Sequence, residues 1–263
     1  MTNQFPFVTI FDKSYEELKQ MRLCINCSCG KDSVAVCIFC YERGIPIHSI
    51  IRYDNGDDWD CMETVWEQLK YLYQGTDTVF VKLKGTPLLD LINERHYYKV
   101  GEHTCFGYIP CGPLNRFGTD DKQKVLNDYI YSNGCTSVIG IAKDEDRKLF
   151  ESVSYPLIEL GYDEGACLLL CYKNGFEWRE MTDFGFTVRL YDYCSRLSCI
   201  HCGFCNSNQL AMIIALFPSK FETFNDIQKR LDVPFKYWSS TFNMPLRLRD
   251  KVKAIRDSCG RSS

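Results

Sequence analysis

The chain has 263 residues, of which 45% are hydrophobic and 25% are charged, and its formal net charge is −3. This composition is ordinary for a soluble globular protein, and the weakly negative charge argues against nucleic-acid binding driven by overall charge. No apolar run is long enough to span a bilayer, and the N-terminal residues lack the basic and apolar regions of a secretory signal. We therefore expect a cytoplasmic protein with no membrane partner.

Strand-like and helix-like segments alternate through the first half of the chain. In chain order, the apolar periodicity predicts a strand at 22–27, a helix at 34–40, a strand at 45–53, a helix at 60–73, a strand at 78–83, a short helix at 87–92, a loop at 94–118, a helix at 120–131 and a strand at 137–141. This order predicts an α/β fold with a mostly parallel five-stranded sheet between helices. We expect residues 1–160 to form this core, and residues 161–263 to form a helical, cysteine-rich region packed on it.

A small polar loop, Ser28-Cys29-Gly30-Lys31-Asp32-Ser33, joins the first strand to the first helix. Main-chain N–H groups at a helix N-terminus point at an anion and the helix dipole adds to the attraction, so this position suits a phosphate. Lys31 supplies a mobile cation, and the hydroxyl groups of Ser28 and Ser33 can donate to phosphate oxygens. The spacing differs from that of a Walker A loop. An ordinary polar turn without a ligand is the alternative.

The same six residues resemble the PP-loop, Ser-Gly-Gly-x-Asp-Ser, of the adenine nucleotide α-hydrolase superfamily. The lysine-containing form resembles that of the phosphoadenosine phosphosulfate (PAPS) reductase family, whose compact members are often encoded by phages. The resemblance implies that residues 28–33 bind the phosphates of an adenine nucleotide, with Lys31 and Asp32 in catalytic roles. Cys29 stands where the family usually has glycine, which costs free energy if the position requires a positive φ.

Two later segments extend the resemblance. Asp54-Asn55-Gly56 is similar to the family's Asp-Thr-Gly segment, and residues 139–147 are similar to its Gly-Ile-(Arg/Ala)-x-Asp-Glu segment, which an arginine follows. The resemblance implies that both segments bind the nucleotide, with Arg147 on a phosphate or sulfate. Because the carboxyl ends of parallel strands share one edge of a sheet, both are expected to lie near residues 28–33. An Asx turn and a solvated loop are the alternatives.

Four of the 16 cysteines, Cys194-x4-Cys199-x2-Cys202-x2-Cys205, have the spacing of a metal site. Thiolates at these spacings can converge on one centre, and four-sulfur ligation suits zinc or a 4Fe-4S iron–sulfur cluster. The spacing does not choose between the two. A redox-active dithiol with two further cysteines is the alternative. Many of the other cysteines stand in apolar stretches and are expected to pack as small hydrophobic residues.

Two reactions compete within the family that the chain resembles. In reduction, a thiolate attacks the sulfur of PAPS. Cys259 is the candidate nucleophile, and a thiol reductant such as thioredoxin is the expected partner. In adenylation, ATP with Mg²⁺ is cleaved to AMP and pyrophosphate to activate an acceptor, nucleic acid included. The lysine-containing loop favours reduction. The reductases' C-terminal tail, Glu-Cys-Gly-(Ile/Leu)-His, is incomplete around Cys259, where the glutamate and the histidine are missing, and this and the four cysteines favour adenylation. A regulatory module that binds a nucleotide without turnover is a third alternative, and a homodimer remains open.

Overall fold

The computed structural model describes residues 6–87, 90, 97–100, 102–106, 119–202, 205–229 and 246–259. The chain divides into two compact units. Unit 1 comprises Met1–Asp54, Cys61–Lys84 and Lys122–Glu177, and unit 2 comprises Asn55–Asp60, Gly85–Asp121 and Trp178–Ser263. The domain boundary expected at residue 160 stays a prediction, and the main division between the contact units falls after residue 177 instead.

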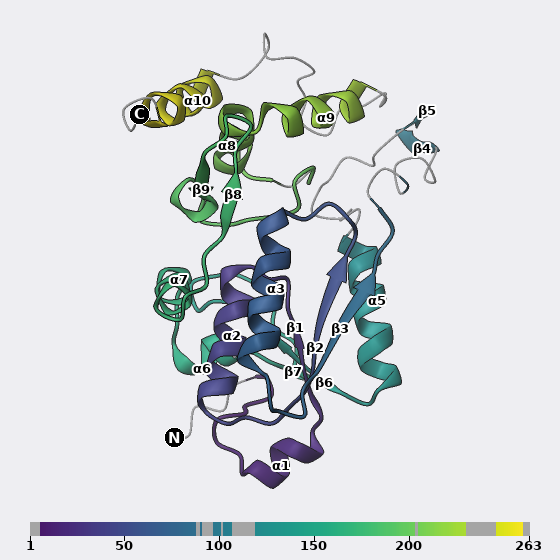
Figure 1. The fold of residues 1–263 in the computed structure, drawn as a ribbon. Coiled ribbons are helices and arrows are strands. Elements are labelled where there is room, and N and C mark those ends of the chain that lie inside the picture. The colour runs from purple at the N-terminus through teal and green to yellow at the C-terminus, as the bar shows by residue number, and fades with distance from the viewer. Residues whose placement is uncertain are drawn as a thin grey trace. The chain divides into compact units, whose positions relative to one another are not determined.

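A five-stranded parallel sheet forms the centre of unit 1 (Figure 1). Its strands are β1 (Leu23–Asn26), β2 (Ile47–Asp54), β3 (Val79–Lys84), β6 (Thr136–Ile139) and β7 (Val153–Ser154). They lie in the order β3-β2-β1-β6-β7, and every neighbouring pair is parallel, which confirms the predicted α/β fold. Apolar periodicity does not reveal β7, because this strand has only 2 residues.

Helices cover both faces of this sheet. The described helices of this unit are α1 (Tyr15–Gln20), α2 (Lys31–Glu42), α3 (Asp60–Leu72), α5 (Thr119–Ser132), α6 (Pro156–Leu160) and α7 (Glu164–Lys173). Figure 1 shows α2 and α3 on one face and α5 on the other. The alternation of side chains along a strand gives each face its own apolar residues, so each face needs its own helices.

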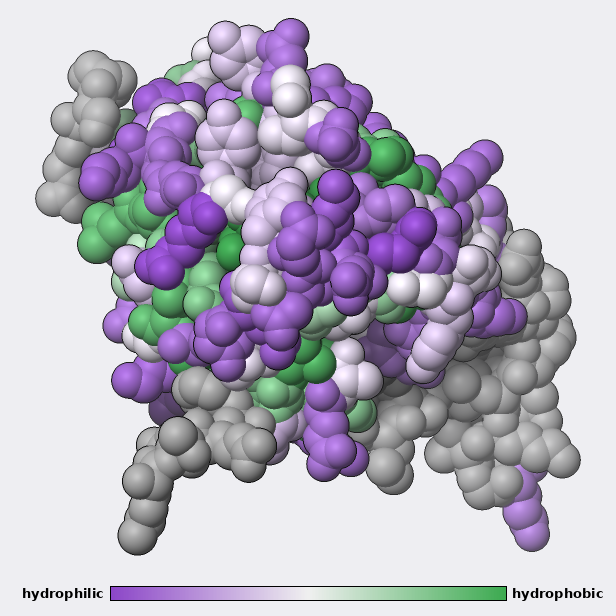
Figure 2. All heavy atoms as spheres, turned by 90° about the horizontal axis from the view of Figure 1, so that it is seen from below, coloured by the Kyte–Doolittle hydropathy of each residue, from purple (hydrophilic) through white to green (hydrophobic). Residues whose placement is uncertain are grey.

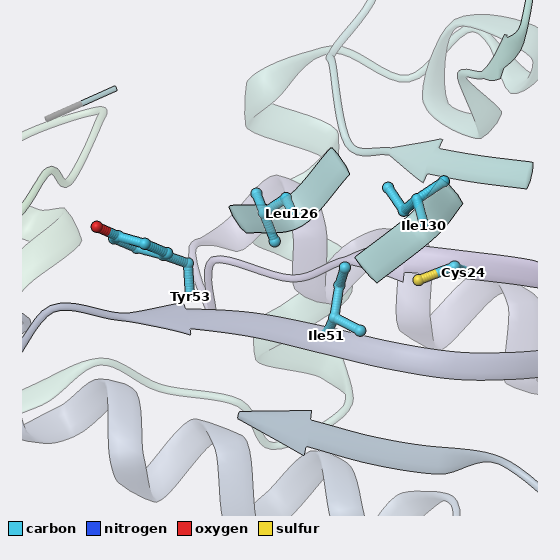
Figure 3. Close-up of a cluster of buried hydrophobic side chains, with 5 residues drawn as sticks. All are labelled: Cys24, Ile51, Tyr53, Leu126 and Ile130. Atoms are coloured by element: carbon cyan, nitrogen blue, oxygen red, sulfur yellow. The ribbon is translucent and has the colours of Figure 1, made fainter. Parts of the chain in front are cut away.

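The face under α5 carries a small buried cluster (Figure 3). Leu126 and Ile130 of α5 pack against Cys24 of β1 and against Ile51 and Tyr53 of β2. Fully burying a side chain of the size of leucine or isoleucine contributes roughly 1.5–3 kcal/mol. The cluster therefore fixes α5 across the first two strands.

Aromatic side chains join α3 to the opposite face. Trp66 of α3 packs edge-on against Phe80 of β3, with ring centroids 5.2 Å apart. The hydroxyl of Tyr73, at the end of α3, donates to the Cys37 carbonyl of α2 at 2.7 Å. This contact ties the two helices together on the sheet.

Many of the isolated cysteines pack as small hydrophobic residues, as expected. The buried ones include Cys24, Cys37, Cys40, Cys167 and Cys171, whereas Cys135 is half-buried. Burial raises the pKa of the Cys24, Cys40 and Cys167 thiols to about 12. These thiols therefore stay protonated at neutral pH.

Unit 2 is built from hairpins and helices. Its described elements are β4 (Tyr97–Val100), β5 (His103–Phe106), β8 (Arg179–Met181), β9 (Thr187–Arg189), the 3₁₀ turn η1 (Leu190–Asp192), α8 (Ser207–Leu216), α9 (Pro218–Lys229) and α10 (Leu246–Cys259). β4 pairs with β5 and β8 with β9, both antiparallel. The first hairpin corrects the loop expected at 94–118, because cross-strand pairing is invisible to periodicity within one short segment. The helix expected at 87–92 lies largely outside the described residues.

Hydrophilic side chains predominate on the face shown in Figure 2, and hydrophobic ones lie between them. Some large apolar residues are exposed, among them Tyr71, Tyr131 and Leu169. Within the part of the chain that the structure describes, no helix combines the length and the apolar character that crossing a membrane requires.

Candidate functional site

The loop between β1 and α2 lies where the order of the strands reverses. In open parallel sheets, ligands bind in the crevice outside this point, at the carboxyl ends of the strands. Gly30 is the N-cap of α2 and brings no side chain to cap the helix, whereas Ser14 caps α1 and Asp163 caps α7. The N-terminus of α2 therefore presents main-chain N–H groups and the positive end of the helix dipole at the crevice.

Two hydroxyl groups flank this helix end. The hydroxyl oxygens of Ser28 and Ser33 are 3.3 Å apart, and the Ser33 hydroxyl donates to the Gly30 carbonyl at 2.9 Å. Since the proton of Ser33 is used in this way, Ser28 is the donor of the pair. Ser33 is buried and Ser28 is exposed, so Ser28 is the hydroxyl that a ligand can reach.

Cys29 has a left-handed backbone conformation, with φ at 57°. A non-glycine residue with this conformation costs about 1–2 kcal/mol, so the glycine usual at this place in the resembling family has a physical reason. The Cys29 side chain is completely buried, and its N–H donates to the Cys27 sulfur at 3.4 Å. Burial of the side chain offsets part of the conformational cost.

Gly140 brings the 139–147 segment against this loop within unit 1. It directly follows β6, the strand beside β1, and a Cβ at residue 140 would lie 2.7 Å from the Asp32 carbonyl oxygen and 2.9 Å from the Ser33 nitrogen. Only glycine fits so close to another main chain. The two segments therefore meet at the edge of the sheet where the sequence predicts them.

Lys31 is not the mobile cation that the sequence predicts. Its side chain is 3% exposed, and its Nζ lies 3.1 Å from Asp32 Oδ2 and 2.8 Å from Glu164 Oε2. Burial alone would lower the pKa of Lys31, but the two carboxylates raise it above its ordinary value. Burial also raises the pKa of Asp32, and the nearby Lys31 offsets only part of this.

Glu164 is a site residue that the sequence does not reveal. It lies 133 positions from its partner Lys31, so no spacing links the two. The one local signal is the pair Asp163-Glu164, which is typical of the start of a helix.

Arg147 is exposed and paired within its own segment. Its Nε lies 2.9 Å from Glu145 Oε2, and the other oxygen of Glu145 accepts from the Ala142 N–H at 3.4 Å. The Arg147 side chain is 42% exposed, and its role in binding a phosphate or sulfate stays a prediction.

The segment Asp54-Asn55-Gly56 straddles the two units. Asp54 ends β2 in unit 1, whereas Asn55 and Gly56 belong to unit 2. Asn55 Oδ1 accepts from the Asp57 N–H at 3.1 Å and Gly56 has φ at 71°, which is the Asx turn named as the alternative. A nucleotide-binding role of these three residues stays a prediction.

The four cysteines predicted to bind a metal do not form a ligand shell. Among the described residues, no three His, Cys, Asp or Glu side chains come together as metal ligands would. The Cys194 thiol donates to the Leu190 carbonyl at 3.4 Å, and the Asn55 amide donates to the Cys199 sulfur at 4.0 Å. A zinc or iron–sulfur centre at these four cysteines stays a prediction.

A carboxylate from another segment holds the loop of these cysteines in place. Asp57 accepts from the main-chain N–H of His201 at 3.0 Å and from its Nδ1 at 2.5 Å. Nε2 of the same ring lies 3.2 Å from the Lys220 carbonyl. Both ring nitrogens of His201 therefore face acceptors, and the ring has a structural role within unit 2.

Cys259, the candidate nucleophile, is the last residue of α10. Its sulfur lies 3.6 Å from the Tyr193 hydroxyl in unit 2. Burial and this hydrogen bond raise the pKa of Tyr193 to about 12. The thiol is thus held on a helix of 14 residues.

A groove of about 1070 Å³ lies elsewhere in unit 1. Its lining comes from α3, from the end of α2 and from residues 174–176, and it includes none of the predicted site residues. Strand topology and the contacts of the loop, rather than this groove, define the candidate site.

No protein-family model matches the chain, and no curated protein sequence matches it either. The NH3-dependent NAD synthetase from Campylobacter jejuni subsp. jejuni NCTC 11168, in complex with the nitrate ion, is 10% identical over 93% of this chain and 88% of that chain, with a TM-score of 0.37. The U34-tRNA thiolase NcsA from Methanococcus maripaludis, with its 4Fe-4S cluster, is 13% identical over 88% of this chain and 81% of that chain, with a TM-score of 0.39. Neither similarity is strong enough to assign a function to this chain.

Proposed function

We propose that the chain is an enzyme of the PP-loop type that binds ATP on residues 28–33 and activates an acceptor by adenylation. The observation that carries the proposal is the junction of three parts within unit 1. An N-terminus of α2 without a side-chain cap, an exposed Ser28 hydroxyl and the close main chain of Gly140 meet where the strand order reverses. This combination suits a polyphosphate.

In the proposed reaction, an oxygen of the acceptor attacks the α-phosphorus of ATP. The bond from this phosphorus to the oxygen bridging to the β-phosphorus breaks, pyrophosphate leaves, and the acceptor proton passes to solvent. No group is oxidised or reduced. The N–H groups of the loop and the Ser28 hydroxyl would bind the departing pyrophosphate, and Lys31 would balance its charge. Mg²⁺ is the expected counter-ion of ATP, and carboxylates such as Asp32 are the ligands it prefers.

The setting of Cys259 favours adenylation over reduction. A reductive attack on PAPS requires a reactive thiolate, which the C-terminal tail of the resembling reductases supplies. Here the thiol belongs to the last residue of α10 and is hydrogen-bonded to Tyr193. The glutamate and histidine that flank the cysteine in that tail are also missing from the sequence around Cys259. Reduction remains the second candidate, because the loop contains Lys31 at the place where the reductases have lysine.

Product analysis separates the two reactions. ATP with Mg²⁺, PAPS and adenosine phosphosulfate are supplied in turn, the last two with thioredoxin, and ATP is tested with and without pooled tRNA and DNA as acceptors. Release of pyrophosphate with an equal amount of AMP, either attached to the acceptor or freed when the adenylate is cleaved, supports adenylation. Release of sulfite selects reduction. A folded protein that binds none of the three nucleotides overturns the proposal.

A further inference from the structure

Lys31 is the positively charged residue of the loop 28–33, and its side chain is buried. Its ammonium group contacts Asp32 of its own helix and Glu164 of α7, at 3.1 and 2.8 Å. The Glu164 contact is the shorter of the two. Lys31 has three donors, and at least two of them therefore point at carboxylates.

Glu164 is held in this position by its surroundings in unit 1. Its N–H donates to Asp144 Oδ1 at 3.1 Å, and the preceding residue, Asp163, caps α7 by accepting from the Ala166 N–H at 2.7 Å. About two helical turns after Glu164, the Cys171 thiol donates to the Lys31 carbonyl at 3.2 Å. Glu164 and Cys171 of α7 thus both contact Lys31 at the start of α2. The packing of the two helices therefore fixes the Lys31–Glu164 contact.

The charges at this helix end do not suit an anion as they stand. One ammonium group faces two carboxylates, which leaves a net charge of about −1 on the three side chains at neutral pH. Glu145, which is paired with Arg147, also acts on Asp32. A phosphate approaching the loop gains little from Lys31 while Glu164 holds it.

We propose that Glu164 is a positioning residue that holds Lys31 in a buried ion pair, the withdrawn state. A nucleotide's phosphates then bind by replacing Glu164 as the partner of Lys31. This inference rests on the proposed function, because it requires an adenine nucleotide at residues 28–33. The observed affinity for the nucleotide is then the intrinsic affinity multiplied by the fraction of molecules in which Lys31 is released from Glu164.

The test measures ATP affinity by isothermal titration calorimetry with Mg²⁺ present. Glu164→Gln keeps the size of the side chain and removes its charge, so it is expected to bind ATP about 5- to 20-fold more tightly than the wild type. The control, Glu151→Gln, removes an exposed carboxylate of the same unit and is expected to leave the affinity unchanged. In a Lys31→Met background, adding Glu164→Gln is expected to give no gain.

The background variant separates an exchange through Lys31 from a general effect. A gain that persists with Lys31→Met shows that loss of charge alone is responsible and overturns the inference. Equal or weaker binding by folded Glu164→Gln overturns it as well. If Glu164→Gln does not fold, Glu164→Asp replaces it, because the shorter side chain draws the carboxylate away from Lys31 and is also expected to tighten binding.

A second measurement does not depend on ATP. Amine-specific labelling mapped by mass spectrometry is expected to modify Lys31 slowly in the wild type and several-fold faster in Glu164→Gln. Equal rates contradict the withdrawn state. If neither protein binds any adenine nucleotide, the proposed function fails and the inference with it. If both bind ATP equally, only the inference fails.

Discussion

The main chain of Gly140 lies so close to that of Asp32 that a Cβ at residue 140 would be 2.7 Å from the Asp32 carbonyl oxygen. Gly140 follows β6 and Asp32 is in the first turn of α2, so this contact joins two strand ends at the point of strand reversal. Any side chain at residue 140 has to displace the helix start that carries the candidate site.

Gly140→Ala is therefore expected to destabilise the protein by about 1–3 kcal/mol, as overpacking of a tight main-chain contact does. Gly165→Ala is the matched control, because its Cβ would meet only Asp163 Oδ1, at the ordinary distance of 3.4 Å. Alanine inside helix α7 is expected to be neutral or stabilising by up to about 1 kcal/mol. Urea unfolding of both variants provides the measurement, and an equal effect of the two substitutions would show that the close contact is absent.

Lys31 and Asp32 are expected to matter for binding. Lys31→Ala removes the cation of the loop and Asp32→Ala removes the carboxylate proposed as a ligand of Mg²⁺, so each should weaken ATP binding by about tenfold or more. Calorimetric titration gives the affinities, and circular dichroism checks that the helices persist. Two folded variants with wild-type affinity would remove the loop from the site.

Glu159 is expected to support the N-terminal segment of unit 1. Its carboxylate accepts from the main-chain N–H groups of Ile10, at 3.1 Å, and Phe11, at 2.9 Å. Glu159→Ala leaves both donors without this partner and should cost about 2 kcal/mol or more of unfolding free energy. Glu159→Gln keeps an acceptor oxygen and should cost less, and the opposite ranking would contradict this role.

The charge of Glu159 also predicts a pH dependence. Burial raises the pKa of this carboxyl group, and the main-chain hydrogen bonds reverse only part of the shift. The folded protein therefore holds the proton more tightly than the unfolded chain does. The stabilisation is fully present below the unfolded value, near 4.5, and is lost as the pH rises through the higher folded value. The stability of the wild type relative to Glu159→Gln should fall over this range, and a rise would contradict the assignment.

Much of the sheet is predictable from the sequence because its strands are buried. Residues 23–26 and 47–54 read as apolar runs, and the polar loop between the first strand and α2 interrupts the pattern clearly. The strained backbone of Cys29 is also predictable, because a residue that stands in place of a glycine has to adopt the conformation that the glycine allows. The positive φ of Cys29 confirms this prediction.

The contacts that set the charge of the site are not predictable in this way. The partnership of Lys31 with Glu164 spans 133 positions and exists only because α7 packs on α2. For Asn55, the sequence motif likewise does not predict the hydrogen bonds that the structure shows. Its place in a family-like motif predicts a ligand contact, yet its described hydrogen bonds form a turn and reach Cys199.

The four cysteines at 194–205 allow a test of the metal prediction by alkylation. Cys199 and Cys202 are half-buried, as are Cys135 and Cys259, so in metal-free protein iodoacetamide should modify these four before the buried cysteines. A bound metal would protect Cys199 and Cys202 until a chelator is added. Mass-spectrometric mapping before and after chelation, with zinc and iron analysis of anaerobically purified protein, distinguishes the two states. Protection that chelation removes would restore the metal centre predicted from the spacing.

We propose that phosphates of an adenine nucleotide bind on the β1–α2 loop, and one pair of variants tests this binding most directly. Ser28→Glu places a carboxylate at the exposed hydroxyl of the loop, whereas Thr64→Glu places one on the exposed face of α3 in the same unit. The measurement is the ATP affinity of both variants and of the wild type, by calorimetric titration with Mg²⁺. We expect Ser28→Glu to weaken ATP binding by about tenfold or more, through repulsion between like charges, and Thr64→Glu to match the wild type. Unchanged ATP affinity in a folded Ser28→Glu protein would contradict the account.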